Sequence, residues 1–337
     1  MLKVAMIGFG GIAQIHRYAY WYHNRQGVPI RLVAACDKDP KKFEESTTIN
    51  FSVGTIDDEL PFAQYSEWEE MLDKEKPDLV DICLPTKFHE AITVAVLERG
   101  YAVMCEKPMA PDFEACRRMV AAAERSGKPL MIGQCVRFYS AYEYLKQLID
   151  DKTYGKVLEA EFCRYSPLPA WSGNAWQQDN KQSGGCLTEL NIHDVDVVRW
   201  LFGDPDSASC VLETRKTPED VVKVRYHYPF GDVAVNGGWL DGGEKFTYGY
   251  RVRFEGAEII MKDNAMTITI DGVSKPIEWE DVDGIVGEIA YFAKVLAGEC
   301  KNTKNPAVAS AQTIKLLEWL HESAAHNGQK MPVRFED

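Results

Sequence analysis

Two side chains in the second half of the chain have the chemistry and spacing of an acid–base pair. Glu189 and His193 are four residues apart, so a helix through both would place them on one face. A carboxylate beside an imidazole is suited to proton transfer near neutral pH. The same two side chains also fit a structural pair or two metal ligands. A metal site needs a third ligand, and none is obvious in the sequence, so we expect no metal.

A further candidate is Lys107, in the sequence Glu106-Lys107-Pro108 directly after an apolar run. A lysine in a half-buried crevice can transfer a proton, or stay charged and stabilise an alkoxide. The segment Leu84–His89 follows another apolar run in the same way. Open α/β sheets bind ligands at the carboxyl ends of their strands, so both segments are candidate binding loops. On spacing alone, a solvated Glu106–Lys107 pair before a helix is the better explanation.

The segment Gly8–Ala13 has the pattern GxGxxA, after one apolar run and before a helical stretch. In that context the pattern is typical of a dinucleotide-binding turn. Gly8 would allow the tight turn, Gly10 the approach of a pyrophosphate, and Ala13 close packing of helix on strand. The alternative is a glycine-rich turn in a sheet that binds no ligand.

Asp37 ends the second apolar run, where a dinucleotide-binding domain places its ribose-binding carboxylate. A carboxylate there accepts hydrogen bonds from the adenosine ribose and repels a 2′-phosphate. We therefore expect NAD. NADP is the alternative, because the neighbouring Lys38 weakens the preference for NAD.

The first third of the chain supplies elements that can position these residues. Continuous apolar runs alternate with helical stretches, which predicts a doubly wound parallel sheet covered on both faces. The expected strands are Lys3–Ile7, Arg31–Cys36, Leu79–Leu84, Tyr101–Met104 and Pro129–Gly133, and the expected helices are Ile12–His23, Pro40–Glu45, Phe88–Leu97 and Ala115–Arg125.

After about residue 134 the pattern changes to an α+β domain. A long helix is expected over Cys186–Leu201, and strand follows strand from Ala208 to Trp279, which predicts a large, open, mostly antiparallel sheet. We place a dinucleotide-binding domain at 1–134 and a substrate-binding and oligomerisation domain at 135–337. A last helix, Pro306–His326, could pack on either domain.

The open sheet suggests self-association. Val233–Trp239 carries apolar residues on both alternations, with Asn236 as its only polar side chain. A sheet face that cannot be solvated usually meets another protomer. We expect a homodimer or a homotetramer through this face.

The loop Pro167–Gly185 is rich in aromatic and amide side chains, which suit the faces and hydroxyl rims of a sugar. A subunit interface explains its tryptophans equally well. Arg137 and Tyr139, just past the fifth strand, are further candidates for lining the substrate site. The loop side chains concerned are Trp171, Asn174, Trp176, Gln177 and Gln178.

Charge and composition exclude several classes of partner. Lys and Arg total 38 and Asp and Glu total 51, giving a net charge of −13, which repels nucleic acid and anionic lipid. The 337 residues hold no apolar run long enough to span a membrane, and glycines break the opening segment too early for a signal peptide. Nine cysteines without a CxxC pair indicate free, mostly buried thiols. We therefore expect a cytoplasmic protein that binds neither nucleic acid nor membrane.

Together the motifs resemble the Gfo/Idh/MocA family of glucose–fructose oxidoreductase and inositol dehydrogenase. The resemblance covers essentially the whole chain, and the ordered set is specific for the family but uninformative about the substrate. A tail helix ending near Ser323 before a short strand at Pro332-Val333 also fits. The matching residues are Gly8–Ala13, Asp37, Pro85-Thr86, His89, Glu106-Lys107-Pro108, Gly184-Gly185 and His193-Asp194.

The resemblance implies a Rossmann domain, an open-sheet domain, and a nicotinamide in the crevice between them. It implies hydride transfer at a secondary hydroxyl of a sugar, glycoside or cyclitol, with Lys107 and His193 as the catalytic pair. The carboxylate before the histidine is usually Asp in the family and is Glu189 here, while Asn191 stands where Gly is common. The longer carboxylate reaches further, so we expect a changed hydroxyl contact or a changed orientation of His193.

The expected site residues fall into three groups. The catalytic residues are Lys107, His193 and Glu189; the cofactor-binding residues are Gly8, Gly10, Gly11, Ile12, Ala13, Asp37, Pro85, Thr86, His89, Glu106 and Lys107; the substrate-binding residues are Arg137, Trp171, Trp176 and Asn191.

Three functions remain open at this point. The first is a net NAD(P)-dependent oxidoreductase. The second is a redox-neutral enzyme that oxidises a glycoside transiently, eliminates the glycosidic bond and returns the hydride. The third is a non-catalytic, sugar-responsive regulator, which would be expected to lack the Lys107 and His193 pair.

Overall fold

The computed structural model describes residues 1–44, 54–58, 60–169, 177–240 and 245–335. Their contacts group them into two compact units: Met1–Phe138 with Asp283–Ala311, and Tyr139–Val282 with Gln312–Asp337. The contacts thus assign residues 283–311 to the first unit, although they follow the second sheet in the chain. The division into a dinucleotide-binding domain at 1–134 and a substrate-binding and oligomerisation domain at 135–337 stays a prediction.

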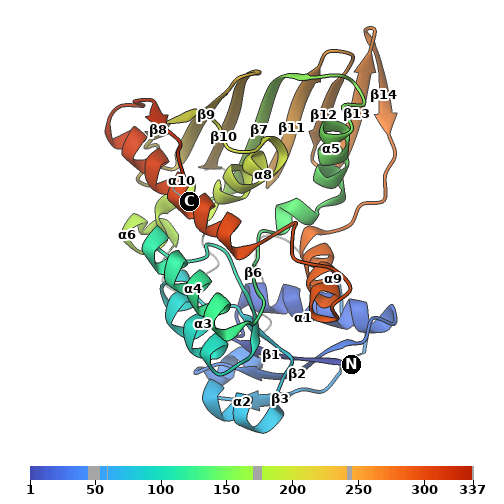
Figure 1. Cartoon of the computed structure of the whole chain (residues 1–337), viewed down its shortest axis with the longest axis vertical. Coiled ribbons are helices and arrows are strands. Elements are labelled where there is room, and N and C mark those ends of the chain that lie inside the picture. Colours follow the sequence, from blue (N-terminus) through green and yellow to red (C-terminus); the bar gives the residue numbers. More distant parts are fainter. Residues whose placement is uncertain (45–53, 59, 170–176, 241–244, 336–337) are drawn as a thin grey trace. The chain divides into compact units, whose positions relative to one another are not determined.

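The first unit alternates strands and helices (Figure 1). Its elements are β1 Leu2–Ile7, α1 Gly11–Arg25, β2 Ile30–Cys36, the 3-10 helix η1 Pro40–Phe43, β3 Ala63–Tyr65, α2 Trp68–Glu75, β4 Leu79–Ile82, η2 Thr86–Phe88, α3 His89–Glu98, β5 Ala102–Cys105, α4 Phe113–Ser126, β6 Leu130–Ile132, η3 Cys135–Phe138 and α9 Gly284–Leu296.

The six strands of the first unit form one parallel sheet in the order β3-β2-β1-β4-β5-β6. The strand order reverses between β1 and β4, which makes their carboxyl ends the switch point of a Rossmann-like sheet. Helices α1 and α9 lie on one face of the sheet and α3 and α4 on the other (Figure 1). The doubly wound parallel sheet expected from the sequence is confirmed.

A series of backbone hydrogen bonds fixes the carboxyl edge of this sheet. The amide of Gly8 donates to Cys36 O at 2.8 Å, and the amide of Cys83 donates to Ile7 O at 2.8 Å. The amide of Glu106 then donates to Ile82 O at 3.0 Å. The segments that leave β1, β4 and β5 are therefore fixed side by side, and they carry the candidate residues.

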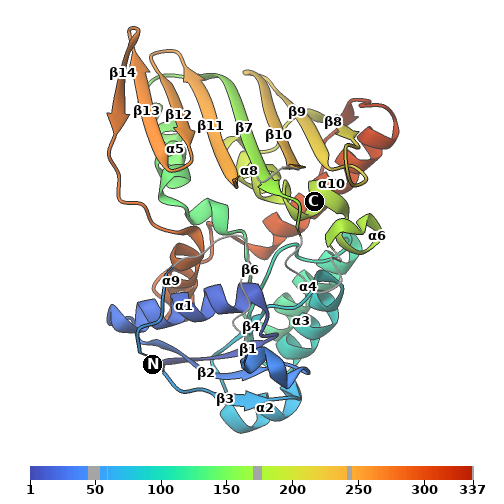
Figure 2. The same ribbon diagram turned by 180° about the vertical axis from the view of Figure 1, so that it is seen from behind.

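The second unit is built on a larger sheet (Figure 2). Its elements are α5 Ser140–Asp150, β7 Val157–Pro167, α6 Asn180–Ser183, α7 Gly185–Glu189, α8 Ile192–Phe202, β8 Ser207–Glu213, β9 Val221–Tyr228, β10 Gly231–Leu240, β11 Thr247–Phe254, β12 Glu258–Lys262, β13 Ala265–Ile270, β14 Val273–Ile277, β15 Met331–Pro332 and α10 Ala307–Ala325, which begins among residues of the first unit.

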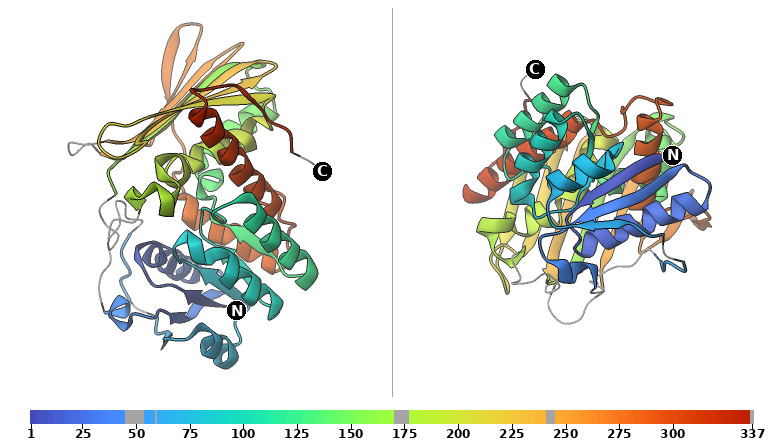
Figure 3. Two further views of the ribbon diagram at one scale, coloured as in Figure 1. Left: turned by 90° about the vertical axis from the view of Figure 1, so that its left-hand side faces the viewer. Right: turned by 90° about the horizontal axis from the view of Figure 1, so that it is seen from below.

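Nine strands form this sheet in the order β14-β13-β12-β11-β7-β10-β9-β8-β15. Only β10 and β7 pair in parallel, and the remaining described pairs are antiparallel. Helices α5, α8 and α10 cover one face (Figure 3). The large, mostly antiparallel sheet expected from the sequence is confirmed. None of the helices in the described part of the chain has both the length and the apolar character needed to cross a membrane.

The opposite face of this sheet carries charged side chains. Arg253 pairs with Glu159 at 3.2 Å and Arg251 pairs with Glu258 at 2.7 Å. On β10, Val233 and Val235 are fully buried, while Ala234 and Asn236 are partly exposed. Self-association through this face stays a prediction, and a partner would have to accommodate these ion pairs.

The continuous helix expected over Cys186–Leu201 is wrong. The structure has α7 and α8 instead, separated at Leu190 and Asn191. The amides of Leu190 and Asn191 both donate to Cys186 O, at 3.0 and 3.1 Å. Because one carbonyl accepts from two successive amides, the regular hydrogen-bond pattern of the helix is interrupted at this point. Glu189 therefore ends one helix and His193 begins the next.

All nine cysteines lie among the described residues and carry free thiols. Most are buried in strands or helices, and Cys300 is exposed. Burial raises the pKa of Cys36 to about 12 and so favours its neutral thiol.

Candidate active site

The glycine-rich turn after β1 has the shape that a diphosphate needs. Gly8 has φ +91°, and a Cβ there would meet Cys83 O and the Leu84 side chain, so only glycine fits. Gly10 caps α1 without a side-chain hydrogen bond, and a Cβ on it would meet nothing within 4 Å. The N-terminus of α1 follows this glycine directly, and a helix N-terminus stabilises negative charge. Ala13 is fully buried, and Gly11 and Ile12 are partly exposed between them.

Asp37 lies beside this turn. Its Oδ2 accepts a hydrogen bond from the Phe9 amide at 2.8 Å, and its Oδ1 accepts one from the Asp39 amide at 2.9 Å. These bonds hold a half-buried carboxylate next to the glycines, as a ribose diol requires. Turn, helix end and carboxylate together fit a dinucleotide.

The segments after β4 and β5 are joined by His89. Its buried ring lies between Leu84 O and Pro108 O, with Nε2 and Nδ1 at 2.7 and 2.8 Å. Burial lowers the pKa of His89, and the hydrogen bonds to the two carbonyls oppose that shift. His89 thus holds two loops together, while Thr86 is buried and Pro85 exposed in the first of them.

Glu106 and Lys107 leave β5 with different surroundings. Glu106 is 6% exposed; its Oε1 lies 3.0 Å from His16 Nε2, and its Oε2 accepts from the Lys107 amide at 3.1 Å. The interpretation of Glu106 as one half of a solvated pair is therefore wrong, because its carboxylate is buried and bonded inward. Lys107 is half-buried at the carboxyl edge of the sheet.

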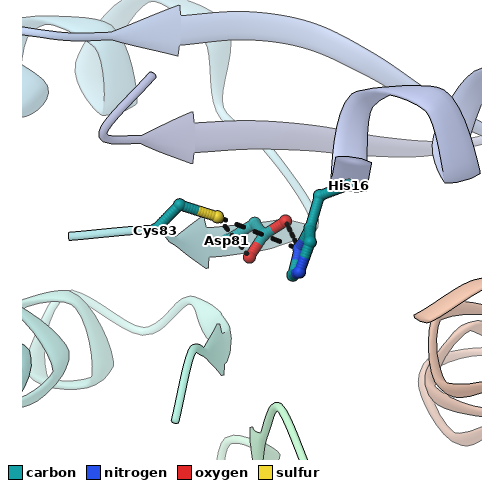
Figure 4. Close-up of side chains that lie close together, drawn as sticks. All are labelled: His16, Asp81 and Cys83. Atoms are coloured by element: carbon teal, nitrogen blue, oxygen red, sulfur yellow. Dashed lines mark hydrogen bonds and ion pairs between the residues drawn. The ribbon is translucent and has the colours of Figure 1, made fainter. Parts of the chain in front are cut away.

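A cluster of buried ionisable groups lies next to Glu106. Asp81 Oδ2 lies 2.8 Å from His16 Nδ1, and the thiol of Cys83 lies 3.8 Å from the same nitrogen (Figure 4). The same Asp81 oxygen accepts a hydrogen bond from Tyr20 Oη at 2.9 Å. Burial is the largest single effect and lowers the pKa of His16, but Asp81 and Cys83 together raise it well above the usual value. Burial raises the pKa of Cys83 to about 12, which keeps the thiol neutral.

The buried cluster also has the side-chain types of a metal site. The ligand atoms of His16, Asp81 and Cys83, and those of His16, Glu106 and Glu288, lie within 4.8 Å of one another. Both nitrogens of His16, however, are at hydrogen-bond distance from carboxylate oxygens, which can only accept. With both carboxyl groups ionised, each nitrogen carries a proton, and a metal ion could bind His16 only by displacing one of these contacts. The contacts themselves are those of a buried ion cluster.

Glu288, on α9, yields a prediction about stability. Burial raises its pKa well above the usual value, and the nearby Glu106 adds to the shift. The folded chain then keeps a proton that the unfolded chain releases above about pH 4.5, so the free energy of unfolding falls as pH rises through this interval. We expect Glu288→Gln to be more stable than the parent chain at about pH 8, by about 1–3 kcal/mol, and to match it below about pH 4.

Urea unfolding at the two pH values checks this prediction. The control is Glu299→Gln, which replaces an exposed carboxylate shortly after α9. The difference in unfolding free energy between this variant and the parent chain should not change with pH. A Glu288→Gln chain that is less stable than the parent at both pH values would show that the carboxyl is not held neutral.

In the second unit, Glu189 and His193 follow the glycine pair. Gly184 and Gly185 have φ +76° and +72°, which lets the chain turn sharply into α7. Glu189 is the last residue of α7, and His193 is in the first turn of α8; both are half-buried.

Asp194 holds the first turn of α8 in place. Its carboxylate accepts hydrogen bonds from Arg164 of β7 at 2.7 and 3.3 Å, and both side chains are buried. The Arg164 guanidinium also lies 5.4 Å from the centre of the Tyr248 ring. Burial raises the pKa of Asp194, and Arg164 opposes that rise. The pair fixes the backbone of His193 through its neighbour.

The residues expected to contact substrate lie in different surroundings. Asn191 is fully buried, and a Cβ on Gly237 of β10 would meet its side chain. Arg137, in the first unit, is 3% exposed and donates from Nη1 to Lys304 O at 2.8 Å. Trp171, Trp176 and Asn174 lie outside the described residues.

Sequence reasoning missed two features of the first unit. The first is the buried group around His16, since His16 and Asp81 were read only as parts of a helix and a strand. The second is Lys304, whose pKa burial and the neighbouring Arg137 lower to about 8. The only sequence signal for the buried group was a histidine on the buried face of a helix. No sequence signal pointed to Lys304.

Comparisons with known proteins agree with this geometry. Residues 2–134 match the family model described as "Oxidoreductase family, NAD-binding Rossmann fold", and residues 142–256 match the "GFO/IDH/MocA C-terminal domain".

Among the relatives, the D-glucoside 3-dehydrogenase of Escherichia coli K12 is 30% identical over 210 residues, 60% of this chain and 55% of that protein. The inositol 2-dehydrogenase of Ralstonia nicotianae is 29% identical over 221 residues, 64% of this chain and 59% of that one. The alignments thus span little more than half of these relatives.

The crystal structure of levoglucosan dehydrogenase with NADH has a TM-score of 0.82 at 18% identity, covering 99% of this chain and all of that one, and it shows a shared fold. The two family models together span well over half of the residues. The chain therefore belongs to the Gfo/Idh/MocA family of NAD-binding oxidoreductases.

Proposed function

We propose that the protein is an NAD-dependent dehydrogenase that transfers a hydride between nicotinamide and a secondary hydroxyl of a sugar, glycoside or cyclitol. The observation that carries this proposal is the arrangement at the carboxyl edge of the first sheet. The glycine turn, Asp37 and Lys107 leave neighbouring strands there, and backbone hydrogen bonds fix their order. A dinucleotide site thereby has a half-buried cation next to it.

Each catalytic candidate has a distinct role in this proposal. NAD, when bound, supplies the hydride acceptor. His193 accepts the proton of the substrate hydroxyl, since an imidazole suits proton transfer at neutral pH. Lys107 donates a hydrogen bond to the same oxygen and stabilises the negative charge that develops on it. The exchange of these two roles is the alternative, and in either case Glu189 orients the imidazole or a neighbouring substrate hydroxyl.

The names of the relatives support the substrate class. D-glucoside, inositol and levoglucosan dehydrogenases act on ring compounds rich in hydroxyl groups. Glu189 and Asn191 are the departures from the usual family pattern, so we expect the choice among such substrates to depend on them. The regulator hypothesis is disfavoured because Lys107 and His193 are both present.

The test mixes the protein with NAD and a panel of sugars, glycosides and inositols. Reduced nicotinamide is followed by absorbance while products are separated by chromatography. Reduced nicotinamide accumulating with one substrate class supports the proposal and identifies the substrate. A product without reduced nicotinamide supports the redox-neutral alternative instead, and neither with any substrate contradicts both.

Asp37 yields a prediction about cofactor choice. We expect Asp37→Ala to weaken NAD binding by about 10- to 100-fold, because hydrogen bonds to a charged group contribute roughly 1.5–3 kcal/mol. The relative use of NADP should rise, because the carboxylate no longer repels a 2′-phosphate. Titration of tryptophan fluorescence with each cofactor measures both effects.

Asp39→Ala is the matched control, because Asp39 caps η1 and is exposed. Its affinity for NAD should stay within about threefold of the parent value. Equal losses in both variants would indicate a general disturbance of the loop rather than a ribose contact.

A further inference from the structure

We propose that His16 is a positioning residue for Lys107, acting as a buried imidazolium that joins Asp81 on β4 to Glu106 after β5. This inference rests on the proposed role of Lys107 in hydride transfer. It concerns contacts within the first unit alone.

The hydrogen bonds of His16 determine its charge. Nδ1 lies 2.8 Å from Asp81 Oδ2 and Nε2 lies 3.0 Å from Glu106 Oε1, with the ring fully buried. A neutral imidazole has one N–H and could satisfy only one of these carboxylates. Two charge-assisted bonds therefore call for a ring that is protonated on both nitrogens.

The surrounding groups favour that charge. Asp81 and Glu106 are the carboxyl groups bonded to His16, while Glu288, Cys83 and Tyr20 have raised pKa values and stay neutral. His16 is bonded to both Asp81 and Glu106 and supplies positive charge between them. Without it, two buried carboxylates would face one another without compensation, which costs several kcal/mol.

Glu106 passes this constraint to Lys107. Its Oε1 is held by His16, and its Oε2 accepts from the Lys107 amide at 3.1 Å. The Glu106 amide in turn donates to Ile82 O, at the end of the strand that carries Asp81. The backbone from which the Lys107 side chain extends is thus fixed from both sides.

The Glu106 carboxylate packs closely against the backbone at Gly133. A Cβ on Gly133, just after β6, would lie 2.7 Å from Glu106 Oε1, closer than such atoms approach. Its φ is not in the left-handed region, so alanine suits the backbone there and only displaces the carboxylate. Gly133→Ala therefore perturbs Glu106 without touching His16.

A matched pair of substitutions separates the two bonds of His16. The amide of asparagine overlaps the position of Nδ1, so His16→Asn can keep the Asp81 contact and loses the one to Glu106. The amide of glutamine overlaps the position of Nε2, so His16→Gln can still donate to Glu106. The two variants remove the same charge and differ in which carboxylate they leave unbonded.

We expect His16→Asn and Gly133→Ala to lower kcat by about 10- to 100-fold, because a small displacement of a catalytic group has effects of this size. The KM for NAD should stay within about threefold of the parent value in both. His16→Gln should retain kcat within about threefold. Equal losses in the Asn and Gln variants, or no loss in Asn, would overturn the proposal, since a merely structural histidine predicts no such difference.

A second readout needs no substrate. In ¹⁵N spectra of the ring nitrogens at about pH 8.5, well above the ordinary imidazole pKa, one histidine should remain protonated on both nitrogens. That signal should vanish in His16→Gln. Its absence from the parent spectrum overturns the buried imidazolium. If the imidazolium is seen but Lys107→Met remains active, the proposed function fails. His16 is then a buried cation with no effect on catalysis through Lys107.

Discussion

Lys107→Met should lower kcat by at least about a hundredfold while leaving the affinity for NAD nearly unchanged. The methionine keeps the length and most of the volume of the side chain and removes its charge. The proposed hydrogen bond to the substrate oxygen is then lost in the transition state, where the developing negative charge makes it strongest. Steady-state kinetics with the substrate found in the panel, together with a fluorescence titration of NAD, separate the two quantities.

Lys128→Met is the control for this variant. Lys128 is an exposed lysine just before β6 of the same sheet and takes no part in the site, so its kcat should remain at the parent value. A Lys107→Met enzyme with undiminished kcat contradicts the assignment of Lys107. A large loss of NAD affinity would indicate that the main role of Lys107 is to bind the cofactor.

Asp194→Asn should lower the free energy of unfolding by about 3–5 kcal/mol, because it leaves the buried guanidinium of Arg164 without a compensating charge. The amide fills the same space, so the loss is electrostatic rather than a packing defect. Since Asp194 follows His193 in the first turn of α8, kcat should fall as well. Urea unfolding and steady-state kinetics measure the two effects.

Two comparison variants make this result specific. Removing both charges together, with Arg164→Met and Asp194→Leu in one chain, should restore most of the lost stability. Breaking the exposed Arg253–Glu159 pair with Arg253→Met should cost less than about 1 kcal/mol. The account of the buried pair is contradicted if Asp194→Asn is as stable as the parent chain.

Much of the fold could be predicted because its signals are local. β4 and β5 are fully buried and β1 and β2 mostly so, which makes each strand a largely hydrophobic segment of the sequence. The turn at Gly8 could be predicted for the same reason, since strand, glycines and helix follow directly in the chain. The β-rich half could be recognised from its alternation and its Gly and Asp turns.

Other elements gave weaker signals. β3 has three residues and none of them is fully buried, so it has no apolar run to detect. α9 was missed although Asp283 caps it, accepting hydrogen bonds from the amides of Ile285 and Val286. The break between α7 and α8 depends on two amides sharing the Cys186 carbonyl, which no periodicity reports.

The candidate site was predictable in part. The residues whose roles depend on neighbours in sequence, such as Gly8 and Gly10, were found from spacing. His16 meets Asp81 and Glu106 across 65 and 90 positions, and only the folded sheet brings them together. For the same reason spacing favoured a solvated Glu106, which the structure shows to be buried and bonded to His16.

The most direct test of the central claim follows the hydride itself. A substrate found in the panel is prepared with deuterium on the carbon that bears the reacting hydroxyl, and the nicotinamide and product are analysed by mass spectrometry. We expect one deuterium in each reduced nicotinamide for each substrate oxidised, and labelled nicotinamide should form at least about a hundredfold more slowly with Lys107→Met. Reduced nicotinamide that carries no deuterium, or deuterium that returns to a cleaved product with no reduced cofactor released, would contradict a net dehydrogenase.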